Sequence, residues 1–447
     1  MRSETGTPPF TRRGWRRLDP VARGLMSARF LRSMAQGALV VDFVLYLKAL
    51  GWGAASIGLL LGATGVVGAV LLLAAGMLSD RFGRRPFLMG YQLASAVGAL
   101  AVVVFPHSWV LVLTAVLLGY GRGANGAAGP FAPVEQAWLA ASVSPAGRSQ
   151  AFSLNAALGF LGMGFGTLIG SAVPLFERYL AGPAAYEPLF VLNLVVALVT
   201  TWMIARLHEP PRRAPEAAGG GPVPPPIPST PGAPAHEAPP RAAKPEGGAS
   251  GTAEAAGVTR RENVALTLLT TVNSINAIGI GLIGPLLPYW FAVRFGVGPE
   301  AIGSVYAVTF LLTAVSSVVT GEMGARVGVV RSIIGPRALG VLLLIAMPLM
   351  PAYGWAAGIY AVRSILNRGT AGTRQAFSMA LVRDARRGLA GSLNALSFRL
   401  PSAVGAAAAG WLIGLGLLDL PFFIASGFQF AYVALFGTVL RRYEDGT

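Results

Sequence analysis

The sequence predicts an all-α polytopic membrane protein with twelve transmembrane helices arranged as two parallel-repeat six-helix bundles. Three observations predict it: long apolar runs, few charges, and arginine clusters at alternate gaps between the runs. Of the 447 residues, 54% are hydrophobic and only 12% are charged, and the mean hydropathy is +0.60. An ordinary soluble domain carries about 25% charged residues. A soluble fold would therefore leave these runs without enough polar surface to cover them.

Helix positions follow from the apolar runs, since about 20 apolar residues are needed to span a bilayer. Twelve candidate helices begin near residues 26, 55, 86, 109, 150, 186, 264, 300, 331, 353, 389 and 418. Between the sixth and seventh, residues 209–262 are rich in Pro, Ala and Gly and lack apolar periodicity. Such a composition buries too little surface to offset its ordering entropy, so we predict a disordered linker there. The predicted parts are an N-terminal tail (1–25), an N-terminal bundle (26–208), the linker (209–262), a C-terminal bundle (263–440) and a short tail (441–447).

Orientation follows from the positive charges. The gaps on one side are poor in charge and hold only Lys48, His107, Arg178, Arg294 and Asp419. The alternate gaps hold arginines at 84 and 85, 148, 212 and 213, 260 and 261, 326 and 331, 383, 386 and 387, and 441 and 442. The positive-inside rule then predicts a multi-pass protein of the plasma (inner) membrane, with both termini and the linker in the cytoplasm.

Composition also excludes several classes of function. The balance of 35 Lys+Arg against 19 Asp+Glu is basic, but the arginines lie between apolar segments, so no nucleic-acid partner is expected. The absence of cysteine excludes disulfides and Cys-ligated metals. None of the three histidines (His107, His208, His236) lies in a predicted helix core, and no P-loop, HExxH or nucleophile elbow occurs. We therefore expect no metal, no cofactor and no enzyme activity.

The two halves of the chain repeat each other. EQAWLAASVSPAGRSQAFSLNAA (135–157) aligns without a gap with RQAFSMALVRDARRGLAGSLNAL (374–396). GEMGARVGVVR (321–331) likewise echoes GMLSDRFGRRP (76–86), and both copies fall on the arginine-rich side. Repeats with the same orientation are related by an axis along the membrane normal. The polar matches of the first pair keep one interval: Gln136 with Gln375, Arg148 with Arg387, and Asn155 with Asn394.

With these features the sequence resembles the major facilitator superfamily, in particular its twelve-helix proton-coupled exporters. The sharpest match is the family's signature loop between helices 2 and 3, and the matching residues are Gly76, Leu78, Ser79, Asp80, Arg81, Gly83, Arg84 and Arg85. The resemblance implies that this loop holds the cytoplasmic side closed, with Asp80 near the start of helix 11. The alternative is a positive-inside anchor followed by a turn, for which Gly83 supplies the conformational freedom.

Charged residues inside the predicted helices are functional candidates, because a charge within the bilayer is costly unless it is paired or hydrated. Asp42 and Glu135 are the proton-carrier candidates, and Asp42 is preferred because nothing near it in sequence neutralises it. Arg122 with Gly126 resembles the family's helix-4 motif, which implies that Arg122 tunes a protonatable acid. Asn125 stands where that motif often has Gln. The same helix contains Pro130 and Pro133, which are expected to loosen it.

Other polar residues are candidates to line a central cavity. Asn273 and Asn276 either bind solute or hold helices together. By the repeat, Arg374 corresponds to Glu135, and whether the two meet across the cavity, as a gate or as charge compensation, is left open. The cavity candidates are Arg32, Gln36, Asn125, Gln136, Asn273, Asn276, Arg363, Asn367 and Arg374.

The sequence thus favours a secondary transporter that works by alternating access, with a small-molecule substrate, protons and the lipid bilayer as partners, and that acts as a monomer. Proton-coupled efflux of amphipathic, drug-like compounds is the first interpretation. A transporter of an anionic organic solute is the alternative, because cavity arginines outnumber acids. A non-transporting receptor is a remote third, since the linker is too low in complexity to be an added soluble domain.

Overall fold

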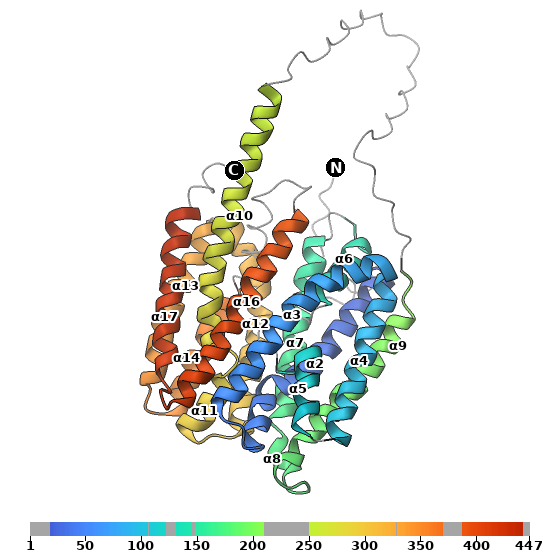
Figure 1. Cartoon of the computed structure of the whole chain (residues 1–447), viewed down its shortest axis with the longest axis vertical. Coiled ribbons are helices and arrows are strands. Elements are labelled where there is room, and N and C mark those ends of the chain that lie inside the picture. The colour runs from blue at the N-terminus through green and yellow to red at the C-terminus, as the bar shows by residue number, and fades with distance from the viewer. Residues whose placement is uncertain are drawn as a thin grey trace, which may run out of the picture.

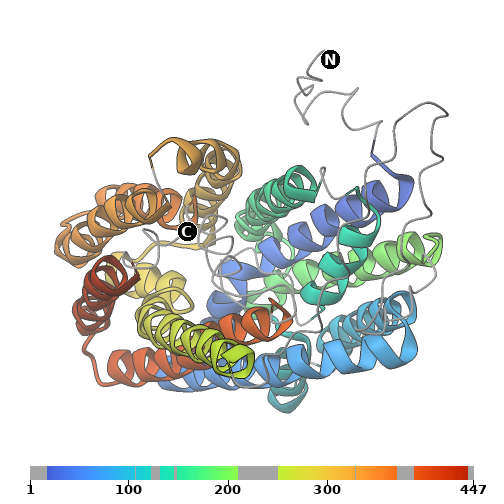
Figure 2. The ribbon, with the colours of Figure 1, turned by 90° about the horizontal axis from the view of Figure 1, so that it is seen from above.

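The computed structural model describes residues 18–105, 107–121, 131–144, 148–209, 250–327, 329–369 and 387–440. Every regular element within these ranges is a helix, and the helices form two bundles that lie side by side (Figures 1 and 2). The all-α fold predicted from the sequence is confirmed.

The N-terminal bundle begins with α2, whose first turn is fixed locally. Asp19 accepts a hydrogen bond from the amide of Val21 at 2.7 Å, and Pro20 occupies the first helical position. The elements of this bundle are α2 (Pro20–Ala49), α3 (Ala54–Phe82), α4 (Arg84–Val104), α5 (Ser108–Leu118), α6 (Ala132–Ala141), α7 (Arg148–Gly170), α8 (Val173–Phe176), η2 (Gly182–Tyr186) and α9 (Glu187–Ala205).

The C-terminal bundle begins with α10, which starts at Ser250, so residues 250–262 are helical although their composition assigns them to the linker. Its elements are α10 (Ser250–Ile283), α11 (Leu287–Phe295), α12 (Pro299–Val327), α13 (Val329–Ala346), η3 (Met347–Leu349), α14 (Tyr353–Gly369), α16 (Arg387–Gly414), α17 (Leu420–Leu435) and the π-helical turn η5 (Phe436–Leu440).

Nine helical stretches in the described ranges are long and apolar enough to cross a membrane, and two shorter apolar helices accompany them. The fourth of the twelve predicted helices is interrupted: α5 ends at Leu118 and α6 begins only at Ala132. Gly119 and Gly121 have positive φ values of 83° and 73°, which end the helix before the two prolines are reached.

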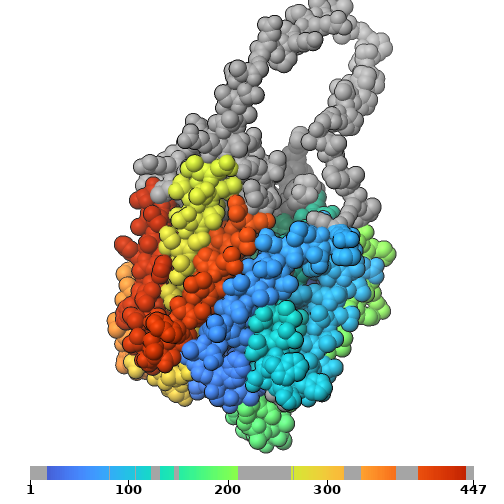
Figure 3. Space-filling view, in the orientation of Figure 1, coloured from blue at the N-terminus to red at the C-terminus, as the bar shows by residue number. Residues whose placement is uncertain are grey.

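The molecule has two distinct ends. The "linker end" is where α9 stops and α10 starts, and α10 projects beyond the bundles there (Figure 1). The "opposite end" carries α8 and the α2–α3 turn. The two bundles touch through α3 against α16 and α7 against α12, and Figure 3 shows the first of these pairs in contact along one face.

Small residues bring the bundles close together at the opposite end. A Cβ added to Gly58 of α3 would lie 2.6 Å from the Cα of Gly410 in α16. A Cβ on Gly303 of α12 would lie 2.9 Å from the Cβ of Ser171, just after α7. Such approach is the packing mode of membrane helices with small residues at the interface.

The buried apolar cores differ between the two ends. At the opposite end one cluster contains residues of both bundles, among them Phe43, Trp290 and Phe310. At the linker end the described residues form separate clusters, one around Trp138 in the N-terminal bundle and one around Tyr432 in the C-terminal bundle. In this conformation the described parts of the two bundles are therefore joined at the opposite end.

Candidate functional site

A buried ion pair links two helices of the N-terminal bundle. Nη2 of Arg32 in α2 donates to Oε2 of Glu135 in α6, and the side chains are 9% and 1% exposed. The sequence leaves open whether Glu135 contacts Arg374, and Arg374 lies outside the described residues. The partner of Glu135 seen here is Arg32, so this pair joins helices of one bundle.

The Arg32–Glu135 pair leaves much hydrogen-bonding capacity unused. Nε and Nη1 of Arg32 and Oε1 of Glu135 are buried and have no hydrogen-bond partner among the described residues. The guanidinium carbon of Arg32 also lies 4.7 Å from the ring centroid of Phe131. A buried ion pair is well stabilised only when its remaining donors and acceptors are satisfied, so the unused donors and acceptor make this pair costly among the described residues.

The charge around the pair is positive. Arg29 lies one turn before Arg32 on α2, is 7% exposed, and is within electrostatic range of both Arg32 and Glu135. These three described side chains, two arginines and one glutamate, by themselves carry a net charge of +1. The segment 122–130, outside the described residues, contributes one further arginine and no acid to the chain.

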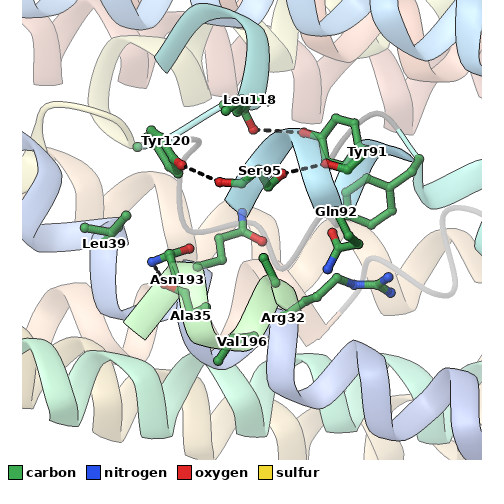
Figure 4. A pocket seen from close by; sticks show the side chains of 15 residues that line it. Arg32, Ala35, Leu39, Tyr91, Gln92, Ser95, Leu118, Tyr120, Asn193 and Val196 are labelled. Atoms are coloured by element: carbon green, nitrogen blue, oxygen red, sulfur yellow. Dashed lines mark hydrogen bonds between the residues drawn. The ribbon is translucent and has the colours of Figure 1, made fainter. Parts of the chain in front are cut away.

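A pocket of about 90 Å³ lies beside the ion pair, between α2, α4, α9 and the break after α5 (Figure 4). The break makes room for it, and its freed backbone groups find partners: Tyr91 Oη donates to the carbonyl of Leu118 at 2.8 Å. Irregular backbone is tolerated at membrane depth where it is buried or lines a cavity. The lining residues are Arg32, Ala35, Gln36, Leu39, Tyr91, Gln92, Ser95, Leu118, Gly119, Tyr120, Gly121, Phe131, Asn193, Val196 and Ala197.

Asp42 lies apart from this pocket. Its side chain is fully buried, and neither carboxyl oxygen has a hydrogen-bond partner among the described residues. It packs against the end of α7, where a Cβ on Gly170 would come within 2.1 Å of Oδ2, and it is within electrostatic range of Tyr186. The two acids singled out from the sequence thus have different surroundings: Glu135 is paired, and Asp42 faces α7 and η2.

The candidates in the C-terminal bundle connect its helices. Asn276 is 1% and Arg363 8% exposed, and Oδ1 of Asn367 lies near Gly340 of α13. None of these residues lines the described pocket. Their hydrogen bonds are Asn273 Nδ2 to Asn394 Oδ1 at 2.8 Å, Arg337 Nη1 to Asn276 Oδ1 at 3.0 Å, and Arg363 Nη2 to Gln429 Oε1 at 3.0 Å.

The signature loop is a tight reversal at Gly83, whose φ is 95°. The amides of Arg84 and Arg85 at the start of α4 donate to the carboxylate of Glu209 at 3.0 and 3.1 Å, which is the favourable position for an anion at a helix N-terminus. Gly76 has no neighbour within 4 Å of an added Cβ, and Arg81 is exposed. The Asp80 side chain lies outside the described part, so its pairing with helix 11 stays a prediction.

Sequence reasoning missed several residues of this region. Glu209 falls within the linker predicted from composition, and no sequence motif singles out Gln92 or Asn193. Each of the last two is a polar residue within an apolar helix, which is the signal that could have identified them. Gln136 is half-buried on α6, whereas Arg122, Asn125 and Arg374 lie outside the described residues. Within the described ranges no group of three or more His, Cys, Asp or Glu side chains is placed to hold a metal ion.

Comparison with known families agrees with this architecture. The sequence model of the Major Facilitator Superfamily matches residues 25–272, more than half of the chain. The chain belongs to the Major Facilitator Superfamily. That membership places it among membrane transporters rather than enzymes.

Curated relatives carry drug-resistance names. The chain is 29% identical over 168 residues to the multidrug resistance protein MdtH of Cronobacter sakazakii, covering 37% of this chain and 40% of that protein. It is 28% identical over 187 residues to the multidrug resistance protein B homolog of Mycobacterium tuberculosis, covering 42% of this chain and 30% of that one. The matched part thus spans less than half the length of either relative.

Solved structures share the fold along nearly the whole chain. A bacterial homolog of the human lysosomal transporter Spinster, in an inward-facing and occupied conformation, superposes with a TM-score of 0.68 at 14% identity and covers 98% of both chains. The POT family transporter PepTSo gives a TM-score of 0.67 at 13% identity, covering 96% of this chain and 99% of its own. At these identities the likeness concerns the fold alone.

Proposed function

We propose that this protein is a secondary active transporter that exports amphipathic organic compounds by proton-coupled alternating access. The observation that carries the proposal is the unequal joining of the two bundles: a shared core at the opposite end, and separate cores at the linker end. Two bundles joined at only one end are the arrangement that rocking between two open states requires. The names of the curated relatives support drug-like substrates.

Orientation completes the proposal. The described arginines of these clusters, among them Arg84, Arg85, Arg148 and Arg387, stand where α4, α7 and α16 begin at the linker end. By the positive-inside rule we infer that this end is cytoplasmic, and that both termini are too, in an inner-membrane protein. The conformation described above is then the inward-open one. A single chain contains both bundles, which is consistent with action as a monomer.

Two buried carboxyl groups supply the proton coupling in this proposal. Asp42 is sealed against α7 and η2, and a buried carboxylate without a partner is costly. It therefore gains or loses a proton as the packing of α2 against α7 changes between the two states. Glu135 holds Arg32 and responds to whatever else binds that arginine.

Transport of an anionic organic solute is the second candidate. It is favoured by the buried arginines of the described residues, Arg29, Arg337 and Arg363, which outnumber the buried acids Asp42 and Glu135. Guanidinium groups are the usual protein partners of carboxylates and phosphates. A receptor without flux remains the remote third candidate.

Thermal unfolding of the purified full chain with a panel of ligands tests the substrate class. A bound ligand stabilises by about 2.7 kcal/mol at a hundred times its dissociation constant. We expect amphipathic organic compounds to raise the unfolding temperature, and matched polar compounds without an apolar part to leave it unchanged. Stabilisation by lipophilic cations alone would rule out the anionic candidate. Stabilisation by no amphipathic compound would contradict the proposed export function.

A further inference from the structure

We propose that the pocket between α2, α4 and α9 is a subsite for a small, planar and uncharged head group with N–H donors, such as a primary carboxamide, at the polar end of an amphipathic substrate. Gln92 and Asn193 are the residues that recognise this head group. The inference rests on the proposed transport function, to which it adds the chemistry of the substrate's polar end.

The side-chain donors around the pocket are largely bonded to acceptors of the protein itself. Asn193 Nδ2 donates to the carbonyls of Ala35 and Leu189, both at 3.0 Å, and Gln92 Nε2 donates to Thr200 Oγ1. The pocket therefore offers few donors to a ligand. The hydroxyl groups also donate to backbone carbonyls (Figure 4): Tyr91 to Leu118 at 2.8 Å, Tyr120 to Ser95 at 3.1 Å, and Ser95 to Tyr91 at 3.0 Å.

The acceptor atoms of the same two amides remain open. Within the described residues Gln92 Oε1 and Asn193 Oδ1 accept no hydrogen bond, yet neither is a fully buried atom. Both residues line the pocket, so these oxygens are available to a ligand. Amide oxygens without donors favour a ligand that brings N–H or O–H groups of its own.

Charge narrows the class of ligand. Arg32 lines the pocket and Glu135 does not, so the ion pair presents its positive end there and repels an ammonium group. A carboxylate finds no open donor on Arg32, because Nε and Nη1 are fully buried and Nη2 is bonded to Glu135. It would face the two amide oxygens instead, at a cost in lost hydration. An uncharged donor group meets neither penalty.

The internal repeat supplies an independent argument. The interval that separates the first residues of α4 and α13 also separates Gln92 from Arg337. In the C-terminal bundle this position therefore holds a planar group rich in N–H donors, and Nη1 of Arg337 donates to Asn276 Oδ1 at 3.0 Å. In the N-terminal bundle the shorter side chain of Gln92 leaves room for the pocket. A ligand with similar donors takes the place of the guanidinium there.

The size of the pocket fits such a head group. Its volume is about 90 Å³, whereas an apolar cavity of about 150 Å³ holds one benzene molecule. By this comparison the pocket takes a group of about three or four heavy atoms, which is the size of a carboxamide. The apolar part of the substrate then lies outside the pocket.

An uncharged head group also suits exchange against protons. Its binding neither brings a charge into the bundle nor requires that a proton enter with it. Proton movement is left to the carboxyl groups of Asp42 and Glu135, neither of which lines the pocket.

The test is calorimetric titration of the full chain in phosphatidylcholine nanodiscs, corrected with empty nanodiscs, using four naphthalene probes: 2-naphthamide, 2-acetonaphthone, 2-naphthoate and 2-naphthylmethylamine. The ketone has the shape of the amide, with a methyl group in place of the amide nitrogen. Two hydrogen bonds to the amide oxygens of the pocket predict that the wild type binds naphthamide about 10-fold more tightly than the ketone. The anion and the ammonium also bind more weakly than naphthamide.

Asn193→Leu and Gln92→Met each remove one acceptor at nearly constant side-chain size. Each variant reduces the preference for naphthamide over the ketone to about 3-fold, since one of the two hydrogen bonds is lost. The affinity for the ketone stays unchanged, which shows that the pocket is still folded. Asn155→Leu is the matched control and retains the wild-type preference, because Asn155 is a buried amide of the same bundle that does not line the pocket.

Equal affinities for naphthamide and the ketone in the wild type would overturn the subsite. So would a full preference in both Asn193→Leu and Gln92→Met, or its loss in Asn155→Leu. Tighter binding of the anion or of the ammonium than of naphthamide would overturn the class of head group. Failure of the transport proposal looks different: the naphthamide preference and its dependence on Asn193 persist, but the protein moves no amphipathic compound across a liposome membrane under a pH gradient.

Discussion

Gly58→Val is expected to separate the two bundles at the opposite end of the molecule. Gly58 lies in α3 where it crosses α16 at the opposite end, and an added Cβ would lie 2.6 Å from Gly410 Cα and 2.8 Å from the carbonyl oxygen of Ala406. Both neighbours are backbone atoms, so no side-chain rotation relieves the clash. The two helices must move apart there.

The magnitude follows from the cost of overpacking, which is about 1–3 kcal/mol for added methyl groups in a tight interface. In alternating access this contact is lost when the opposite end opens, so the cost falls on the conformation described here and not on the other. A difference of about 1–3 kcal/mol shifts the ratio of the two states by about 5- to 150-fold.

Because the chain has no cysteine, spin-label pairs can be introduced directly and their separations measured by double electron–electron resonance. Leu50→Cys with Leu417→Cys reports on the opposite end, and Phe82→Cys with Val264→Cys on the linker end; all four positions are exposed. In Gly58→Val the first pair separates and the second approaches. Gly427→Val is the matched control, since a Cβ there meets nothing within 4 Å. Distances equal to those of this control would refute the reasoning.

Three further predictions concern single side chains. Arg32→Gln removes the hydrogen-bonded cation of buried Glu135, leaving Arg29 within electrostatic range, and lowers the free energy of unfolding by up to about 3–5 kcal/mol; adding Glu135→Gln recovers most of the loss in a thermal melt, and an additive double mutant would contradict the pairing. Asp42→Asn abolishes flux driven by a pH gradient but leaves ligand binding intact, so unchanged driven flux would remove Asp42 from the mechanism. Glu209→Ala removes the acceptor of two amides at the start of α4 and costs about 1–2 kcal/mol, whereas a melting temperature equal to that of the wild type would show that this cap adds nothing.

The fold could be predicted from the sequence because the features that determine it are local or periodic. Apolar run length sets the helices, and a glycine at position 83 permits the reversal that the structure places there with φ at 95°. The family could be identified for the same reason, since eight positions of one short loop match the family's motif. The start of α10 could not be predicted, because the composition of residues 250–262 gives no helical signal that outweighs the Pro- and Gly-rich stretch before them.

The site could be predicted from the sequence only in part, and the break after α5 explains why. Projecting Glu135 onto an ideal helix requires an unbroken register from residue 109 onward, and the left-handed glycines at 119 and 121 remove that register. The direction of Glu135 toward Arg32 is therefore a tertiary result. The pocket is tertiary too, since Gln92 and Asn193 come from helices far apart in the sequence and only packing brings them to Arg32.

The most direct test of the account is transport by the reconstituted full chain. Liposomes with an acidic lumen receive a fluorescent amphipathic carboxylate, with ethidium as a cationic counterpart. A weak acid diffusing passively leaves an acidic lumen, so its accumulation there requires coupled exchange against protons. The account predicts such accumulation with the protein present, and its collapse when an ionophore removes the pH gradient. Equal fluorophore uptake in protein-free and protein-containing liposomes, for both compounds, would contradict it.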